Sequence, residues 1–100
     1  MTLLELIKSV KYNKLTREQL EDYHSQMSNL FAEMQLEMAD LEKEEAIFMN
    51  SKGEDESVAS VKIRWKATQE GQRLLMLKRY ALATKEMISS IKSRVYQLIY

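Results

Sequence analysis

The chain contains no proline and only two glycines, Gly53 and Gly71, so there are few positions at which a helix must end. The residues between these positions are mostly good helix formers. We therefore predict an all-α fold. One hundred residues suffice for about one small domain, and residues 1–100 are predicted to form a single helical-hairpin domain.

Three helices are predicted, over about residues 3–12, 17–50 and 58–99. Thr2 with Glu5, and Thr16 with Gln19, have the spacing of a capping box, which marks the start of a helix. The first, short helix places Leu3, Ile7 and Val10 on one side.

The stretch from Asn50 to Glu56 predicts the turn of the hairpin. Gly53 is suited to a left-handed helix cap, and Asp55 or Ser57 is suited to cap the helix that follows. Further along, Thr68 precedes Gly71 and could cap a restarted helix. We therefore predict a kink at residues 68–71.

Two long apolar stripes with helical spacing predict the contact between the second and third helices. The stripe of the second helix is Leu20, Met27, Phe31, Met34, Met38, Leu41 and Phe48. The stripe of the third helix is Leu74, Leu77, Ala81, Thr84, Ile88, Ile91, Val95 and Leu98. Folding the hairpin about Gly53 places residue i opposite about residue 106 minus i. By this count Trp65 is a packing anchor opposite Leu41.

Charge is distributed unevenly, although 15 acidic and 15 basic residues balance overall. Residues 1–56 carry 13 acidic and 6 basic residues, and residues 57–100 carry 2 acidic and 9 basic residues. We interpret this asymmetry as charge pairing between the antiparallel helices, which sets their orientation more than their stability. The predicted pairs join Glu33, Glu37, Asp40, Glu42 and Glu44 to Arg73, Lys66, Arg64 and Lys62.

The last helix is apolar on more than one side, because Leu75, Leu82 and Tyr96 form a second seven-residue row of the coiled-coil type. One partner helix cannot cover both stripes. We therefore predict a homo-oligomer, most simply a dimer in which two hairpins form a four-helix bundle. The candidate self-association residues are Leu75, Tyr80, Leu82, Met87, Tyr96 and Ile99.

Two other kinds of partner are left open by the charged residues. A nucleic acid could bind a basic set on the last helix, consisting of Lys78, Arg79, Lys85, Lys92 and Arg94. A basic partner protein could bind an acidic hairpin tip that mimics nucleic acid, consisting of Glu42, Glu44, Glu45, Glu54, Asp55 and Glu56. Solvated charge is the structural alternative for both sets.

The sequence argues against an enzyme. It has no cysteine and one histidine, which leaves no disulfide, no thiolate nucleophile and little room for a catalytic triad. Glu21 and His24 have the spacing of a bundle metal site, but the counted register supplies only Glu86 nearby, so we predict no metal and no cofactor. The longest apolar run, Leu74–Leu77, is far shorter than a membrane span, so we predict no membrane partner. The absence of cysteine favours a cytoplasmic protein.

The stretch WKATQEGQRLLMLKRYALATKEMISSIKSR, Trp65–Arg94, resembles the C-terminal helix of small all-helical accessory proteins of tailed bacteriophages. The resemblance covers about a third of the chain and defines no catalytic or binding residue. It implies a phage accessory protein that acts in the host cytoplasm by binding another molecule. Such a protein would assist DNA recombination or replication, chaperone virion assembly, or block a host defence.

Overall fold

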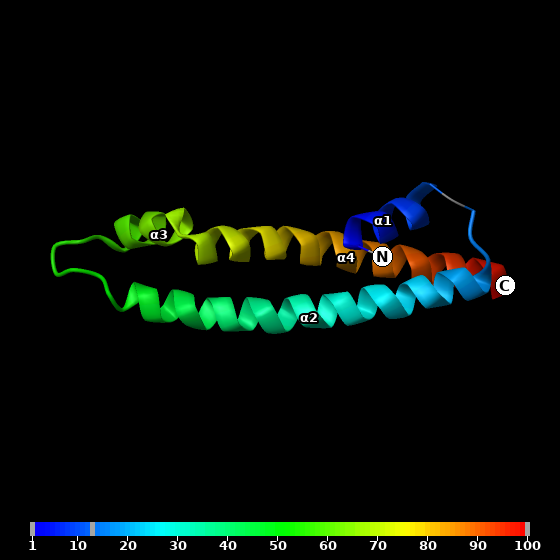
Figure 1. Ribbon diagram of the computed structural model, residues 1–100, viewed down its shortest axis with the longest axis horizontal. Coiled ribbons are helices and arrows are strands. Elements are labelled where there is room, and N and C mark those ends of the chain that lie inside the picture. The colour runs from blue at the N-terminus through cyan, green and yellow to red at the C-terminus, as the bar shows by residue number, and fades with distance from the viewer. Residues whose placement is uncertain (1, 13, 100) are drawn as a thin grey trace. The chain divides into compact units, whose positions relative to one another are not determined.

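The computed structural model describes residues 2–12 and 14–99, and the side chains of Lys11, Tyr12 and Ile99 lie outside the description. In this part of the chain there are four helices and no strand, which confirms the predicted all-α hairpin with a short N-terminal helix (Figure 1). The helices are α1 (Leu3–Tyr12), α2 (Arg17–Met49), α3 (Val58–Ala67) and α4 (Gln69–Ile99).

Contacts divide the chain into two compact units. The first, which we name the α1 unit, consists of α1, α2 up to Glu33 and α4 from Ala81. The second, the loop unit, is Met34–Tyr80. Within each unit the segments of α2 and α4 lie side by side in opposite directions (Figure 1). The single-domain organisation stays a prediction.

Both predicted capping boxes form at the helix starts. The backbone N–H of Glu5 donates to Thr2 Oγ1 at 3.2 Å, and Thr2 N donates back to Glu5 Oε2 at 3.4 Å. At α2, Gln19 N donates to Thr16 Oγ1 at 3.2 Å and Thr16 N donates to Gln19 Oε1 at 2.9 Å. Each box satisfies two backbone donors that a helix leaves unpaired, which explains why α1 and α2 begin where they do.

The core of the α1 unit joins its three helical segments. Its fully covered side chains are Leu6, Val10, Leu20, Met27 and Ile91, each 0–1% exposed. The expected inner face of α1 is corrected here: Leu6 points into the core, whereas Leu3 is only half-buried. Residues 6 and 10 share a side because four residues make about one helical turn. Ile7, Leu15 and Val95 pack around this core.

The predicted stripes of α2 and α4 are largely buried, with two corrections. Leu98 is 57% exposed, because it borders a solvent-open hollow shared with Leu15 and Leu20 at the end of α4. Trp65 is a packing anchor, as predicted, with 5% exposure, but its ring lies against that of Phe48, with 5.5 Å between centroids. The counted register had placed Trp65 opposite Leu41, seven residues earlier in α2.

The loop between α2 and α3 explains this shift of register. Gly53 does not adopt the left-handed conformation that the prediction assigned to it. Ser57 caps α3 by accepting a hydrogen bond from Ser60 N at 3.1 Å, as predicted. Because Phe48 pairs with Trp65, the centre of the turn lies midway between them, next to Glu56, and not at Gly53.

A single residue, Thr68, separates α3 from α4 inside the range of the predicted kink. It is extended (φ −76°, ψ 160°), and its hydroxyl donates to the Trp65 carbonyl at 2.6 Å and accepts from Gly71 N at 3.0 Å. Thr68 thus ends one helix and caps the next. Gly71 lies so close to α3 that an added Cβ would be 2.0 Å from the Trp65 carbonyl oxygen. Close approach, rather than a positive φ, requires glycine here.

Candidate interaction surfaces

The row predicted for self-association is exposed over most of its length. In the α1 unit, Leu82 is 64% and Tyr96 is 63% exposed. In the loop unit, Leu75 is 42% and Tyr80 is 47% exposed. Exposed apolar side chains of this size are the usual constituents of protein interfaces.

The other two residues of the self-association set differ from these four. Met87 is half-buried and packs against the core of the α1 unit beside Ile7 and Val10. It is therefore engaged with α1 rather than turned to solvent. The side chain of Ile99 lies outside the described residues. The exposed members of the set are accordingly Leu82 and Tyr96 in the α1 unit and Leu75 and Tyr80 in the loop unit.

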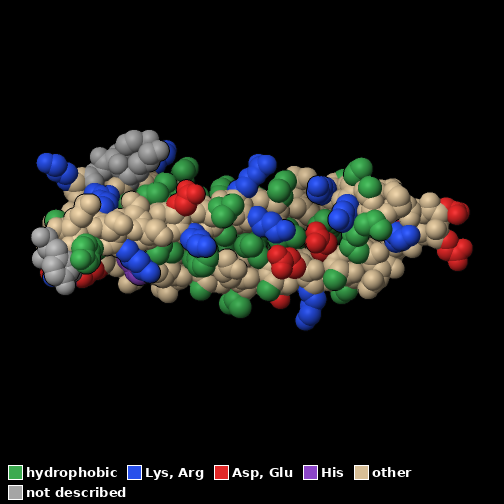
Figure 2. Space-filling model, turned by 180° about the vertical axis from the view of Figure 1, so that it is seen from behind, with side chains coloured by type: hydrophobic (Ala, Val, Ile, Leu, Met, Phe, Trp, Pro, Cys, Tyr) green, Lys and Arg blue, Asp and Glu red, His purple; other side chains and the backbone are tan. Residues whose placement is uncertain are grey.

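Four of the five basic residues singled out on α4 are exposed, namely Lys78, Arg79, Lys85 and Lys92. Figure 2, which views the molecule from behind, shows Lys and Arg side chains (blue) interspersed with apolar ones (green). Arg94 differs, because it is half-buried and its guanidinium donates to the carbonyl oxygen of Val10. This contact joins α4 to the last turn of α1, where carbonyl groups lack helical partners.

Glu21 and His24 border a solvent-open hollow of the α1 unit with Ser25, Lys92 and Val95. The counted register had placed residue 82 opposite His24, whereas the structure places Lys92 beside it. Nε2 of His24 is buried and has no hydrogen-bond partner. In the described part of the chain, no three His, Cys, Asp or Glu side chains come together as metal ligands would.

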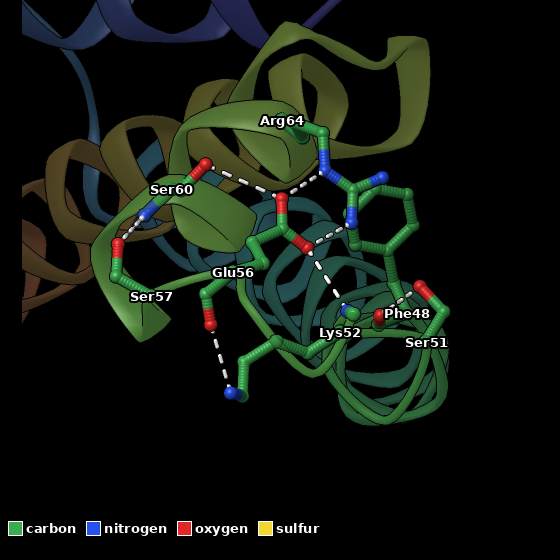
Figure 3. A network of polar contacts seen from close by, with 8 residues as sticks. Phe48, Ser51, Lys52, Glu56, Ser57, Ser60 and Arg64 are labelled. Atoms are coloured by element: carbon green, nitrogen blue, oxygen red, sulfur yellow. Dashed lines mark hydrogen bonds and ion pairs between the residues drawn. The ribbon is translucent and has the colours of Figure 1, made fainter.

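The acidic tip is only partly available to a partner. Glu42, Glu44, Glu54 and Asp55 are exposed and Glu45 is half-buried. Glu56 is held inside the loop unit: its carboxylate accepts from Arg64 Nε at 2.7 Å and Arg64 Nη2 at 2.6 Å (Figure 3).

Further contacts fix this ion pair in place. Ser60 Oγ donates to Glu56 at 3.2 Å, and Lys52 Nζ donates to the Glu56 carbonyl oxygen at 2.8 Å (Figure 3). The Arg64 guanidinium lies 5.2 Å from the centre of the Phe48 ring. The group therefore closes the loop onto the ends of α2 and α3, and we assign Glu56 a structural role.

Two ion pairs shift the pKa of their carboxylates. Hydrogen bonds from Arg64 lower the pKa of Glu56 below its ordinary value of 4.5. Hydrogen bonds from Arg73, at 2.8 and 3.0 Å, lower the pKa of Glu37 in the same direction. The Glu37–Arg73 pair also joins α2 to α4, as the charge pattern predicted, although the count had placed Arg73 opposite Glu33.

These pKa shifts predict how stability depends on pH. A carboxyl whose pKa is lowered by folding stabilises the fold above its unfolded pKa, and this contribution disappears as the pH falls through the folded pKa. We therefore expect Glu56→Gln to lower the melting temperature at pH 7 and to have a smaller effect near pH 3, below the unfolded pKa. Thermal melts from pH 7 to pH 3 measure this difference. Glu54→Gln, in the same loop but exposed, is the control. Equal effects of Glu56→Gln at both pH values would contradict the prediction.

The sequence stripes did not reveal three strongly exposed apolar side chains of the loop unit. They are Leu36 and Ile47 on α2 and Ile63 on α3, with exposures of 71%, 67% and 68%. The sequence did contain an indication of them, because they are large apolar residues that lie outside the core-facing stripes. Leu36 and Ile47 are also eleven residues apart, about three full helical turns.

The fold and these surfaces define an all-helical hairpin protein with exposed apolar and charged helix faces. No family model, curated protein or solved structure matches the chain. Among the described helices, none combines the length and the apolar character needed to cross a membrane. We therefore infer the function from the exposed surfaces.

Proposed function

We propose that this chain is a non-enzymatic interaction protein that associates with itself through the outer face of α4. The observation that carries the proposal is the exposure of Leu82 and Tyr96, which are two heptads apart on one helix. Full burial of a side chain such as leucine stabilises an association by about 1.5–3 kcal/mol, so two such anchors per copy are substantial. The resemblance of Trp65–Arg94 to phage accessory proteins favours a binding role of this kind.

Replacement of both anchors by glutamate is the direct test. We expect Leu82→Glu with Tyr96→Glu to abolish the contact through α4 and so to lower the mass in solution, because a charged side chain cannot enter an apolar contact without a partner. Both positions are exposed, so helix content should be unchanged. Light scattering on a sizing column measures the mass, and circular dichroism measures the helix content.

Leu4→Glu is the matched control, since Leu4 is 61% exposed but lies on α1. It should leave the mass unchanged. Unchanged mass in the double variant, or a wild-type chain that is monomeric at micromolar concentration, would contradict the proposal.

The same mass measurement distinguishes self-association from nucleic-acid binding by the exposed basic residues. A short DNA duplex is added at low and at moderate salt. Self-association through apolar side chains should be indifferent to the duplex, whereas contacts to phosphate weaken steeply as salt rises. A mass that shifts with DNA at low salt only would favour the basic set Lys78, Arg79, Lys85 and Lys92 as the functional surface.

A further inference from the structure

The outer side of α2 in the loop unit carries an apolar stripe that does not face the core. Leu36 and Ile47 are the two most exposed large apolar side chains of this helix, whereas Met34 and Leu41 on the opposite side are 8% exposed. Ala39 and Ala46 are exposed on the same side, and Lys43 lies between them. The segment therefore has two apolar sides, of which the core uses one.

The outer side of α3 has the same construction. Ile63 is 68% exposed, and Ala59 and Ala67, four residues before and after it, are exposed on the same side. The core side of this helix is formed instead by Val61 and Trp65, which are 0% and 5% exposed. Small alanines on both outer faces leave room for another helix to approach the central isoleucine.

The two outer faces carry opposite charges. On the outer side of α2 in the loop unit, the exposed acidic residues Asp40 and Glu44 outnumber Lys43. On α3, Lys62 and Lys66 flank Ile63 and are exposed. Arg64 is the other charged residue of α3, and Glu56 already neutralises it.

These charges have no partner within their own chain. In the part of the chain that the structure describes, ion pairs join Arg17 to Glu21, Arg64 to Glu56 and Arg73 to Glu37, and none involves Asp40, Glu44, Lys62 or Lys66. Asp40 and Lys66 are thus available to an outside partner, whereas Glu37 and Arg73 are not.

Within one molecule the two faces cannot meet. The inner sides of α2 and α3 face each other in the loop unit, as the contact between the rings of Phe48 and Trp65 shows, so their outer sides point away from each other. Every copy of the chain nevertheless carries both faces, so the outer face of α2 on one copy can meet the oppositely charged outer face of α3 on another. Complementary charge directs which surfaces meet and excludes like-charged pairings.

We propose that the outer face of α2 around Leu36, Asp40 and Ile47 docks on the outer face of α3 around Ile63 and Lys66 of a second copy. The inference rests on the proposed function, because it assumes self-association, and it adds a second contact to the one through α4. The contact joins two different surfaces, so each copy keeps one face of each kind available. Such a contact extends into larger assemblies unless a ring closes.

Reversal of charge on one face at a time tests this contact. One variant carries Asp40→Lys with Glu44→Lys, and the other carries Lys62→Glu with Lys66→Glu. Each is expected to weaken association at least tenfold, because both of its faces then carry the same sign. An equimolar mixture should recover the wild-type mass distribution, since the reversed face of each variant complements a face of the other. Light scattering at low and moderate salt measures both effects.

Glu18→Lys with Asp22→Lys is the matched control, because it makes the same change of charge at the same spacing in the α1 unit. It should leave association within about twofold of wild type, the level expected of exposed charges outside an interface. If a charge variant fails to fold, as judged by circular dichroism, Ile47→Ser and Ile63→Ser replace it and should each weaken association.

The outcomes separate this inference from the proposed function. A monomeric wild-type chain overturns both. If the wild type associates and Leu82→Glu with Tyr96→Glu dissociates it, while both charge reversals keep the wild-type mass, the docking of α2 on α3 is wrong and the contact through α4 stands. Failure of the mixture to recover association, after each charge variant alone has lost it, also overturns the docking.

Discussion

Gly71→Ala should lower the free energy of unfolding by about 3 kcal/mol, at the upper end of the usual cost of overpacking. An added Cβ would lie 2.0 Å from the carbonyl oxygen and 2.8 Å from the carbonyl carbon of Trp65, and 3.1 Å from Cα of Lys66. All three are backbone atoms, so no side chain can rotate away. The end of α3 would have to move away from the start of α4, which would disturb the bonds that Thr68 makes to Trp65 and Gly71.

Helix propensity alone predicts the opposite sign, because alanine inside a helix is about 1 kcal/mol more favourable than glycine. Gly53→Ala is the matched control: its nearest neighbour, Cβ of Glu56, would be 3.9 Å away and its φ is not positive. Chemical unfolding of both variants gives the comparison. A stabilised Gly71→Ala protein would show that α3 and α4 are not in contact at this junction.

The second large effect is expected in the α1 unit, where Leu6→Ala should cost about 3 kcal/mol. Leu6 is 0% exposed and touches a core to which α2 and α4 also contribute, so its truncation leaves a cavity that three helices would have to collapse around. Chemical unfolding followed by circular dichroism gives the stability, and amide hydrogen exchange shows whether α1 is released before the rest of the unit.

The comparison for Leu6→Ala lies two residues earlier in the same helix. Leu4 is 61% exposed, so Leu4→Ala makes the same chemical change at the surface and should alter stability by about 0.5 kcal/mol or less. Equal losses in the two variants would mean that α1 is not docked through Leu6 and Val10.

Features determined by a few neighbouring residues could be predicted from the sequence. The capping boxes at Thr2 and Thr16 and the cap at Ser57 form as their spacing indicates, because a cap requires only residues within one helical turn. The burial of Trp65 was predicted as well, although the register count behind it named the wrong partner.

The pairing of the helices could not be predicted by counting. Trp65 meets Phe48 instead of Leu41, and Arg73 meets Glu37 instead of Glu33. Register depends on how the loop is closed by Glu56 and Arg64 and on how far Gly71 lets α4 approach α3, which are contacts between residues that no periodicity joins. A count along the chain treats the turn as symmetric, and this turn is not.

In the candidate surfaces, too, features of one helix could be predicted from the sequence, whereas contacts between helices could not. The exposure of Leu82 and Tyr96 was predictable because a second seven-residue row cannot be covered by the helix that covers the first. The engagement of Met87 and Arg94 was not, since it depends on where α1 lies. The outward position of Leu36, Ile47 and Ile63 was not predicted, because these residues lie outside the core-facing stripes.

The break at Thr68 has a consequence for how the chain can change in evolution. In an unbroken helix, each inserted or deleted residue rotates every later side chain by about 100° around the axis. Because α3 ends at this residue and α4 starts from its own cap, the angular phase of α4 is set afresh there. The loop and α3 can therefore gain or lose residues while Leu82 and Tyr96 keep their side of α4. The break at Thr68 therefore makes the direction of the side chains around α4 independent of the length of α3.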